Sequence, residues 1–148
     1  MTYPLTFVVN GWPLKDGMAG CAVGPVIFIR EGYEKDEGLA EHELIHIMQM
    51  GTFAFVGMIL CQVLMQPFPQ YGYWPVLWGA LAGMVAGGLA YKFIRPYRIW
   101  AEVQAYREQM NYPDRFGNKM TLETGAYRLA LPVYDLGLTI EQAKLCLS

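Results

Sequence analysis

A stretch of 45 residues, from Ile47 to Tyr91, contains no Asp, Glu, Lys, Arg or His. Any helix formed from it is apolar on nearly all sides, so its side chains have to be covered by lipid or by other protein. Near its middle, the segment QPFPQYGYW (66–74) combines two prolines with a glycine, which is typical of a turn. The stretch therefore predicts an antiparallel hairpin of two apolar helices.

The length and the flanks of the second hairpin helix favour a membrane. Residues 73–94 are predominantly apolar, and about 20 such residues cross a bilayer. Aromatic side chains lie at one end, with Tyr91, Lys92 and Arg95 at the other, as in interface anchors. The first helix reaches spanning length only when residues 47–51 are included. We predict a transmembrane hairpin over residues 47–94; the alternative is a hairpin buried by apolar partner subunits in an oligomer or larger assembly.

Small residues recur along both predicted hairpin helices. Gly79, Gly83 and Gly87 lie four apart on the second helix, and Ala54 and Gly57 offer a matching face on the first. Each glycine weakens a soluble helix by about 1 kcal/mol relative to alanine. In lipid, such rows of small residues let two helices pack closely. The pattern therefore favours a tightly packed membrane hairpin.

The residues before the apolar hairpin predict a small β-hairpin or sheet, followed by a long helix. LTFVV (5–9) and PVIFI (25–29) are rich in β-branched and aromatic residues and are bounded by Gly, Pro or Asn, which is typical of strands. MAGCAVG (18–24) between them reads as a flexible connection. Asp36 is a suitable N-cap for a helix, and no proline follows until Pro67.

The residues after the hairpin predict further helices. Pro96 kinks or restarts the second hairpin helix, and YRIWAEVQAYREQM (97–110) reads as an amphipathic continuation. A loop follows at 112–120, then helices over about 121–131 and from Ile140, where Thr139 and Gln142 form a capping-box pattern. We predict an α+β fold, mainly α, in a single zincin-like domain (1–148). Its parts are a β-rich N-terminal part (1–35), zinc-site helices (36–111) containing the hairpin, and a helical tail (112–148).

The clearest chemical motif is His42-Glu43-Leu44-Ile45-His46. Two histidines four apart lie on one face of a helix, so both imidazoles can reach one zinc ion. Glu43 is placed to contact a metal-activated water and to accept its proton. The alternative is a chance spacing of buried histidines, which the metal-binding interpretation outweighs because these are the only two histidines of the chain.

A third zinc ligand has to be an acidic residue, because no other histidine exists. The helix running out from His46 to Gln66 and the helix returning from Pro75 to Arg95 have equal lengths, about 30 Å each. An antiparallel hairpin therefore returns the chain to the level of the motif soon after Arg95. Glu102 is the first acidic residue met there and is the predicted third ligand.

HELIHIMQ (42–49) followed by EVQAY (102–106) resembles the gluzincin branch of zinc metallopeptidases, and most closely a group of small peptidase-like proteins common in bacterial and phage genomes. The resemblance implies His42, His46 and Glu102 as ligands and Glu43 as base. Thermolysin-like gluzincins often place an Asp four residues after the third ligand, where this chain has Tyr106. A zinc histidine must then be oriented by Tyr106 itself or by a backbone carbonyl. A metal-binding but inactive protein stays an alternative.

A peptidase also needs a donor opposite Glu43 that stabilises the developing oxyanion. Tyr106, Tyr127, Arg128 and Arg98 are candidates, and we prefer Tyr106, one turn from Glu102. The alternative for Tyr106 is packing between helices. The strand at 25–29 is either an ordinary core strand, which we favour, or the edge to which an extended peptide substrate adds.

These features predict a membrane-associated zinc metallopeptidase that hydrolyses peptide bonds of a peptide or protein substrate through a zinc-activated water. Lys92, Arg95 and Arg98 predict that the zinc site and both termini face the cytoplasm. The net charge of −2 and the lack of a basic run argue against a nucleic-acid partner. The alternatives are a structural component of an assembly such as a phage particle, with a structural or vestigial zinc site, and a hydrolase acting on something other than peptides.

Overall fold

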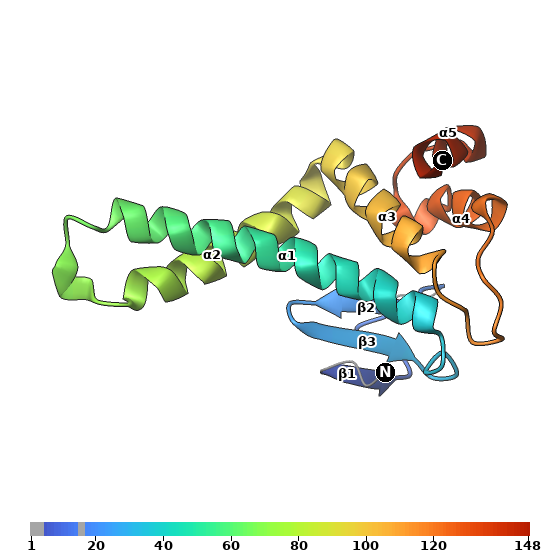
Figure 1. The fold of residues 1–148 in the computed structure, drawn as a ribbon, viewed down its shortest axis with the longest axis horizontal. Coiled ribbons are helices and arrows are strands. Elements are labelled where there is room, and N and C mark those ends of the chain that lie inside the picture. The colour runs from blue at the N-terminus through green and yellow to red at the C-terminus, as the bar shows by residue number, and fades with distance from the viewer. Residues whose placement is uncertain (1–4, 15–16) are drawn as a thin grey trace.

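A computed structural model describes residues 5–14 and 17–148 (Figure 1). Within these residues, a small three-stranded sheet is followed by five α-helices, which confirms the predicted α+β, mainly α, fold class. The strands are β1 (Thr6–Val9), β2 (Gly20–Val23) and β3 (Val26–Arg30). The helices are α1 (Glu37–Leu64), α2 (Trp74–Phe93), α3 (Arg95–Gln109), α4 (Leu122–Leu129) and α5 (Ile140–Leu147), with short 3-10 turns at Pro69–Tyr71 and Pro132–Tyr134.

The sheet has the order β1-β3-β2, with β1 parallel and β2 antiparallel to β3. The prediction of a flexible connection over 18–24 is wrong, because β2 lies there and forms a hairpin with β3. The glycine and alanine of GCAV are poor strand formers, and pairing with β3 overrides that preference. Ile27 and Ile29 of β3 are buried with Leu39 and Ala40 of α1, so one face of the sheet packs on that helix.

Helix α1 begins where the sequence predicts. The Asp36 side chain accepts a hydrogen bond from the Leu39 backbone N–H at 2.8 Å, and the helix continues for 28 residues to Leu64. Only the first turns of α1, over residues 38–43, contain buried residues. The two ends of α1 therefore have different surroundings: the start lies in the body of the protein and the remainder in the hairpin (Figure 1).

The two hairpin helices contact each other through glycines. The buried residues of α2 are Pro75, Gly79, Gly83 and Gly87. A Cβ atom added at Gly79 or Gly83 would overlap backbone atoms of α1, and one at Gly87 would lie 2.9 Å from the Phe53 ring. The large apolar side chains point outward, and α1 and α2 are both long and apolar enough to cross a membrane by length and composition.

After α2 the chain changes direction at Ile94, and α3 begins with Pro96 in its first turn, as predicted. A second apolar cluster joins α3 to the tail, with Val103, Leu129 and Leu147 among its members. Thr139 and Gln142 form the predicted capping box at the start of α5. Helix α3 therefore lies between the tail on one side and the start of α1 on the other, and the candidate site lies between α1 and α3.

Candidate metal centre

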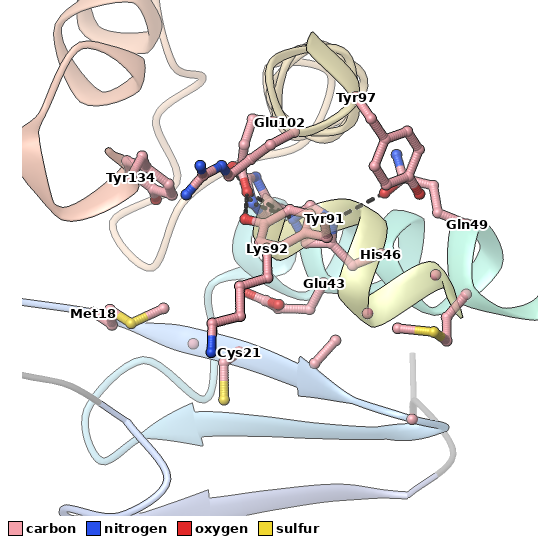
Figure 2. A pocket seen from close by; sticks show the side chains of 18 of the residues that line it. Met18, Cys21, Glu43, His46, Gln49, Tyr91, Lys92, Tyr97, Glu102 and Tyr134 are labelled. Carbon is pink, nitrogen blue, oxygen red and sulfur yellow. Dashed lines mark hydrogen bonds and ion pairs between the residues drawn. The ribbon is translucent and has the colours of Figure 1, made fainter. Parts of the chain in front are cut away.

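Three side chains from two distant parts of the chain meet at the base of the hairpin. The Nε2 atoms of His42 and His46 are 3.2 Å apart. His42 Nε2 lies 3.6 Å from Glu102 Oε2, and His46 Nε2 lies 3.4 Å from Glu102 Oε1. His42 and Glu102 are buried, and His46 is half-buried. This group could hold a metal ion, and Figure 2 shows its surroundings.

The fold explains how residues so far apart in sequence converge. The two histidines are one helical turn apart on α1, which places both rings on the face that α3 covers. The antiparallel hairpin returns the chain alongside α1, and α3 then brings Glu102 opposite the histidines. The structure therefore brings together all three residues that the sequence predicts as ligands.

The electrostatics of the group suit a cation. Burial raises the pKa of Glu102, but the contact with His42 and the positive charges of the histidines outweigh this and lower it. Burial lowers the pKa of His46, and the nearby Glu102 only partly offsets this. Burial also lowers the pKa of His42, but the close contact with the Glu102 carboxylate and its charge raise this pKa above its usual value. An ionised carboxylate therefore faces two imidazole nitrogens that can bind a metal. Glu102 Oε2 is buried with no hydrogen-bond partner among the described residues.

Two further side chains fix these residues. Gln49 Oε1 lies 3.0 Å from His46 Nδ1, and Gln49 Nε2 donates to the Ala101 carbonyl at 3.2 Å. Because an amide oxygen only accepts, His46 carries its proton on Nδ1 and directs an unprotonated Nε2 at the centre of the group. The Tyr91 hydroxyl donates to Glu102 Oε1. Gln49 and Tyr91 therefore orient the second and third predicted ligands.

The Glu43 side chain points toward strand β2 (Figure 2). Burial raises its pKa to about 7, although the charge of His42 and a backbone hydrogen bond from Ala22 act in the opposite direction. A Cβ atom at Gly20 would lie 3.1 Å from Glu43 Oε1, a tight contact, so a glycine at this position lets β2 approach the Glu43 carboxylate closely. A buried carboxylate with a pKa near neutrality can accept and release a proton under ordinary conditions.

A cavity of about 490 Å³ opens beside the three ligand residues. Strand β2 forms one wall, the end of α2 and the start of α3 form another, and Tyr134 of the tail contributes to a third. Glu43, His46 and Glu102 all line it, so a molecule in this cavity has direct access to the metal-binding group. Lys92 and Arg98 bring two positive charges to the same cavity.

Tyr106, the predicted oxyanion donor, is buried beside His42. Its ring contacts His42 edge-on, with centroids 4.7 Å apart, and its hydroxyl donates to the Tyr134 hydroxyl at 2.6 Å. Tyr134 itself lines the 490 Å³ cavity. Of the other candidates, Arg98 lines the same cavity, Arg128 lines a smaller one and Tyr127 is exposed.

The structure also decides between the two interpretations of the strand at 25–29. That segment is β3, the central strand, so the favoured prediction of a core strand is confirmed and the alternative of a substrate-binding edge is wrong. Among the described residues, the unpaired edge of the sheet beside the metal-binding group belongs to β2, where the sequence predicted a flexible connection. Because β2 lines the cavity, it is the strand that an extended ligand would meet.

The roles of Gln49, Tyr91 and Tyr134 in the site were not predicted from the sequence. Gln49 lies one helical turn after His46, so spacing alone could have suggested it as a partner of that ring. Tyr91 ends the uncharged stretch, and its hydroxyl was read as a membrane-interface anchor. The position of Tyr134 depends on the path of the tail, for which the sequence carries no signal.

Comparison with known proteins found no matching family model, no matching curated protein and no matching solved structure.

Proposed function

We propose that this chain is a membrane-associated zinc metallopeptidase of the gluzincin type. The observation that carries the proposal is the spacing of the three ligand atoms. In a tetrahedral zinc site with bonds of about 2.0–2.1 Å, ligand atoms are roughly 3.3–3.4 Å apart. The Nε2 atoms of His42 and His46 are 3.2 Å apart, and each lies 3.4–3.6 Å from one of the two carboxylate oxygens of Glu102, which is close to that spacing. Two histidines and one glutamate also form a ligand set used by catalytic zinc sites, which keep a fourth position open.

A zinc ion held there would supply Lewis-acid chemistry, lowering the pKa of water and polarising a carbonyl. Glu43, with its pKa near 7, serves as the proton acceptor from the attacking water and returns the proton to the leaving amine. The Tyr134 hydroxyl lines the cavity and receives a hydrogen bond from Tyr106, so its own proton is free for the substrate oxygen. Tyr134, supported by Tyr106, is therefore our proposed oxyanion donor.

The edge strand β2 supports a peptide as the substrate. An extended peptide can pair with a free strand edge through its backbone, which gives affinity without a fixed sequence. Strand β2 lines the cavity and its residue Gly20 lies against Glu43. A peptide paired with this edge would pass directly beside the proposed base.

Metal analysis of the purified chain tests the proposal at its foundation. We expect about one zinc per chain, retained in Glu43→Gln, lost in His46→Ala and much weakened in Glu102→Ala. Glu108→Ala is the matched control, because Glu108 lies on α3 but outside the metal-binding group. Zinc binding that is undiminished in Glu102→Ala refutes the ligand assignment. Cleavage of a generic peptide pool that is lost in Glu43→Gln, while zinc is retained, distinguishes a peptidase from a structural zinc site.

The exposed apolar faces of α1 and α2 support a bilayer around the hairpin. Large side chains such as Phe55, Leu64 and Trp78 point outward, whereas the small residues face inward. Lys92 and Arg95 lie at the end of α2 nearest the metal-binding group, which supports a site on the cytoplasmic side. The turn between the helices would then lie on the opposite side.

Reconstitution into liposomes tests the membrane part separately. We expect the chain to float with lipid vesicles and to remain in them after alkaline washing. In intact cells, we expect protease added from outside to cut only in the turn around residues 66–74. A chain that is monomeric and soluble without detergent contradicts this. Recovery in a particle without lipid instead favours the assembly component, in which partner subunits cover the same faces.

A further inference from the structure

The cavity beside the metal-binding group contains two cations that the proposed reaction does not use. Lys92 comes from the end of α2 and Arg98 from the first turns of α3. Figure 2 shows the Lys92 side chain reaching across the cavity toward Cys21 of β2. Two cations from different elements therefore face the space that a substrate would occupy.

Arg98 lacks the partners that a guanidinium in such a position normally has. Its side chain is only 16% exposed, and its Nε atom is buried without a hydrogen-bond partner among the described residues. Within the part of the chain that the structure describes, its one ion pair is with Asp135, at 3.7 Å, and that carboxylate is 88% exposed. Burying a charged group with unsatisfied donors is unfavourable, so an anionic ligand would find the guanidinium ready to bind it.

The charges of the cavity as a whole point to the same kind of ligand. Its lining contains two carboxylates, Glu43 and Glu102, and two cations, Lys92 and Arg98. These charges balance, and a bound divalent metal would add two positive charges. The metal-loaded cavity therefore attracts an anion.

The position of Arg98 limits which anion fits. Arg98 lies four residues before Glu102 on α3, so the two side chains start from the same face, about 5–6 Å apart. One residue of an extended peptide spans about 3.3–3.6 Å. A planar guanidinium binds a carboxylate through two parallel hydrogen bonds. A carboxylate bound to Arg98 would therefore lie only one or two residues from the peptide bond at the metal.

We infer that Arg98, assisted by Lys92, binds the C-terminal carboxylate of a peptide substrate, so that the chain removes one or two residues from the C-terminal end. This inference rests on the proposed peptidase function and adds the substrate class. The side chain of an internal Asp or Glu offers the same chemistry, and the experiment has to separate the two sources.

Binding to the zinc-loaded Glu43→Gln variant tests the inference without turnover. The full chain in detergent micelles is titrated with acetyl-trialanine, with its C-terminal amide, and with the amide of acetyl-Ala-Asp-Ala. We expect the free acid to bind about 10–100-fold more tightly than either amide, because one charge-assisted hydrogen bond strengthens binding by about that factor. The preference should disappear when Arg98→Gln is added, weaken with Lys92→Gln, and persist in the control Asp135→Asn, which removes only the exposed ion-pair partner.

Zinc content is measured in every variant, so that a loss of metal is not mistaken for a loss of the carboxylate site. Equal binding of the acid and its amide refutes the inference, as does a preference that survives Arg98→Gln. Tight binding of the Asp-containing amide shows that an internal carboxylate is recognised, which refutes terminal recognition. A preference for the acid in a wild-type chain that cleaves nothing would refute the peptidase function and leave the carboxylate site in place.

Discussion

Gln49 gives a sharp test of how the metal-binding group is held together. Its amide oxygen fixes the proton of His46 on Nδ1, at 3.0 Å, and its amide nitrogen binds the backbone carbonyl of Ala101, the residue before Glu102. One side chain therefore orients a ligand on α1 and ties that helix to the helix of the third ligand. Gln49→Leu removes both hydrogen bonds and keeps a side chain of similar size.

The expected size of the effect follows from these two bonds. A partly buried hydrogen bond contributes about 0.5–1.5 kcal/mol, so the pair contributes roughly 1–3 kcal/mol. If all of this acts on the metal-bound state, the zinc dissociation constant rises about 5–150-fold. Loss of a partner that orients a metal-binding histidine usually weakens binding by about 10–100-fold, which agrees with that range. We expect the measured effect to fall within it.

Competition with a chelating dye at fixed pH measures the dissociation constant directly. Gln49→Glu is informative because it keeps an acceptor for His46 and loses the donor to Ala101, so we expect a smaller loss than in Gln49→Leu. Gln62→Leu, on the exposed part of α1, is the control for adding an apolar residue to this helix. A folded Gln49→Leu chain that binds zinc within about twofold of wild type refutes the orienting role.

Three further changes test other parts of the site and the hairpin. Gly20→Val places side-chain atoms where Glu43 Oε1 now lies, so we expect peptide cleavage to fall while zinc content stays the same; loss of zinc instead would show that β2 supports the ligands as well. Tyr134→Phe removes the proposed oxyanion donor, and we expect turnover to fall about 10–1,000-fold at unchanged zinc content; a normal rate would assign that role elsewhere. Gly83→Leu forces α1 and α2 apart where their backbones touch, and we expect the free energy of unfolding in detergent to fall by about 1–3 kcal/mol, measured as a lower unfolding midpoint. Gly88→Leu is the control and should be tolerated, because open space surrounds Gly88.

The ligand group could be predicted because its determinants are local or depend on simple lengths. The four-residue spacing of His42 and His46 fixes their shared face. Glu102 follows from two hairpin helices of matching length, which return the chain to its starting level. These inferences require only the rise of a helix and the positions of the prolines.

The sheet could not be predicted in the same way, because its pairing is non-local. The residues of β2 are small and have little preference for a strand, and their pairing with β3 and contact with α1 decide their structure. The parallel pairing of β1 with β3 likewise joins two strands that β2 separates in the sequence. The site residues that sequence reasoning missed follow the same division. Gln49 has a local signal in its helical spacing, whereas Tyr134 reaches the cavity only through the path of the tail.

The hairpin and the metal-binding group depend on each other. Helix α1 runs without a break from the predicted ligands into the apolar hairpin, and Tyr91 near the end of α2 donates to Glu102. The distance between the two helices, set by glycines such as Gly83, therefore determines where Tyr91 and α3 stand relative to the histidines. Within our proposal, a lipid bilayer that holds α1 and α2 close together also helps to complete the zinc site. Zinc affinity measured in lipid should then exceed that measured in a loosely packing detergent, and Gly83→Leu should reduce this difference although it lies far from the metal in sequence.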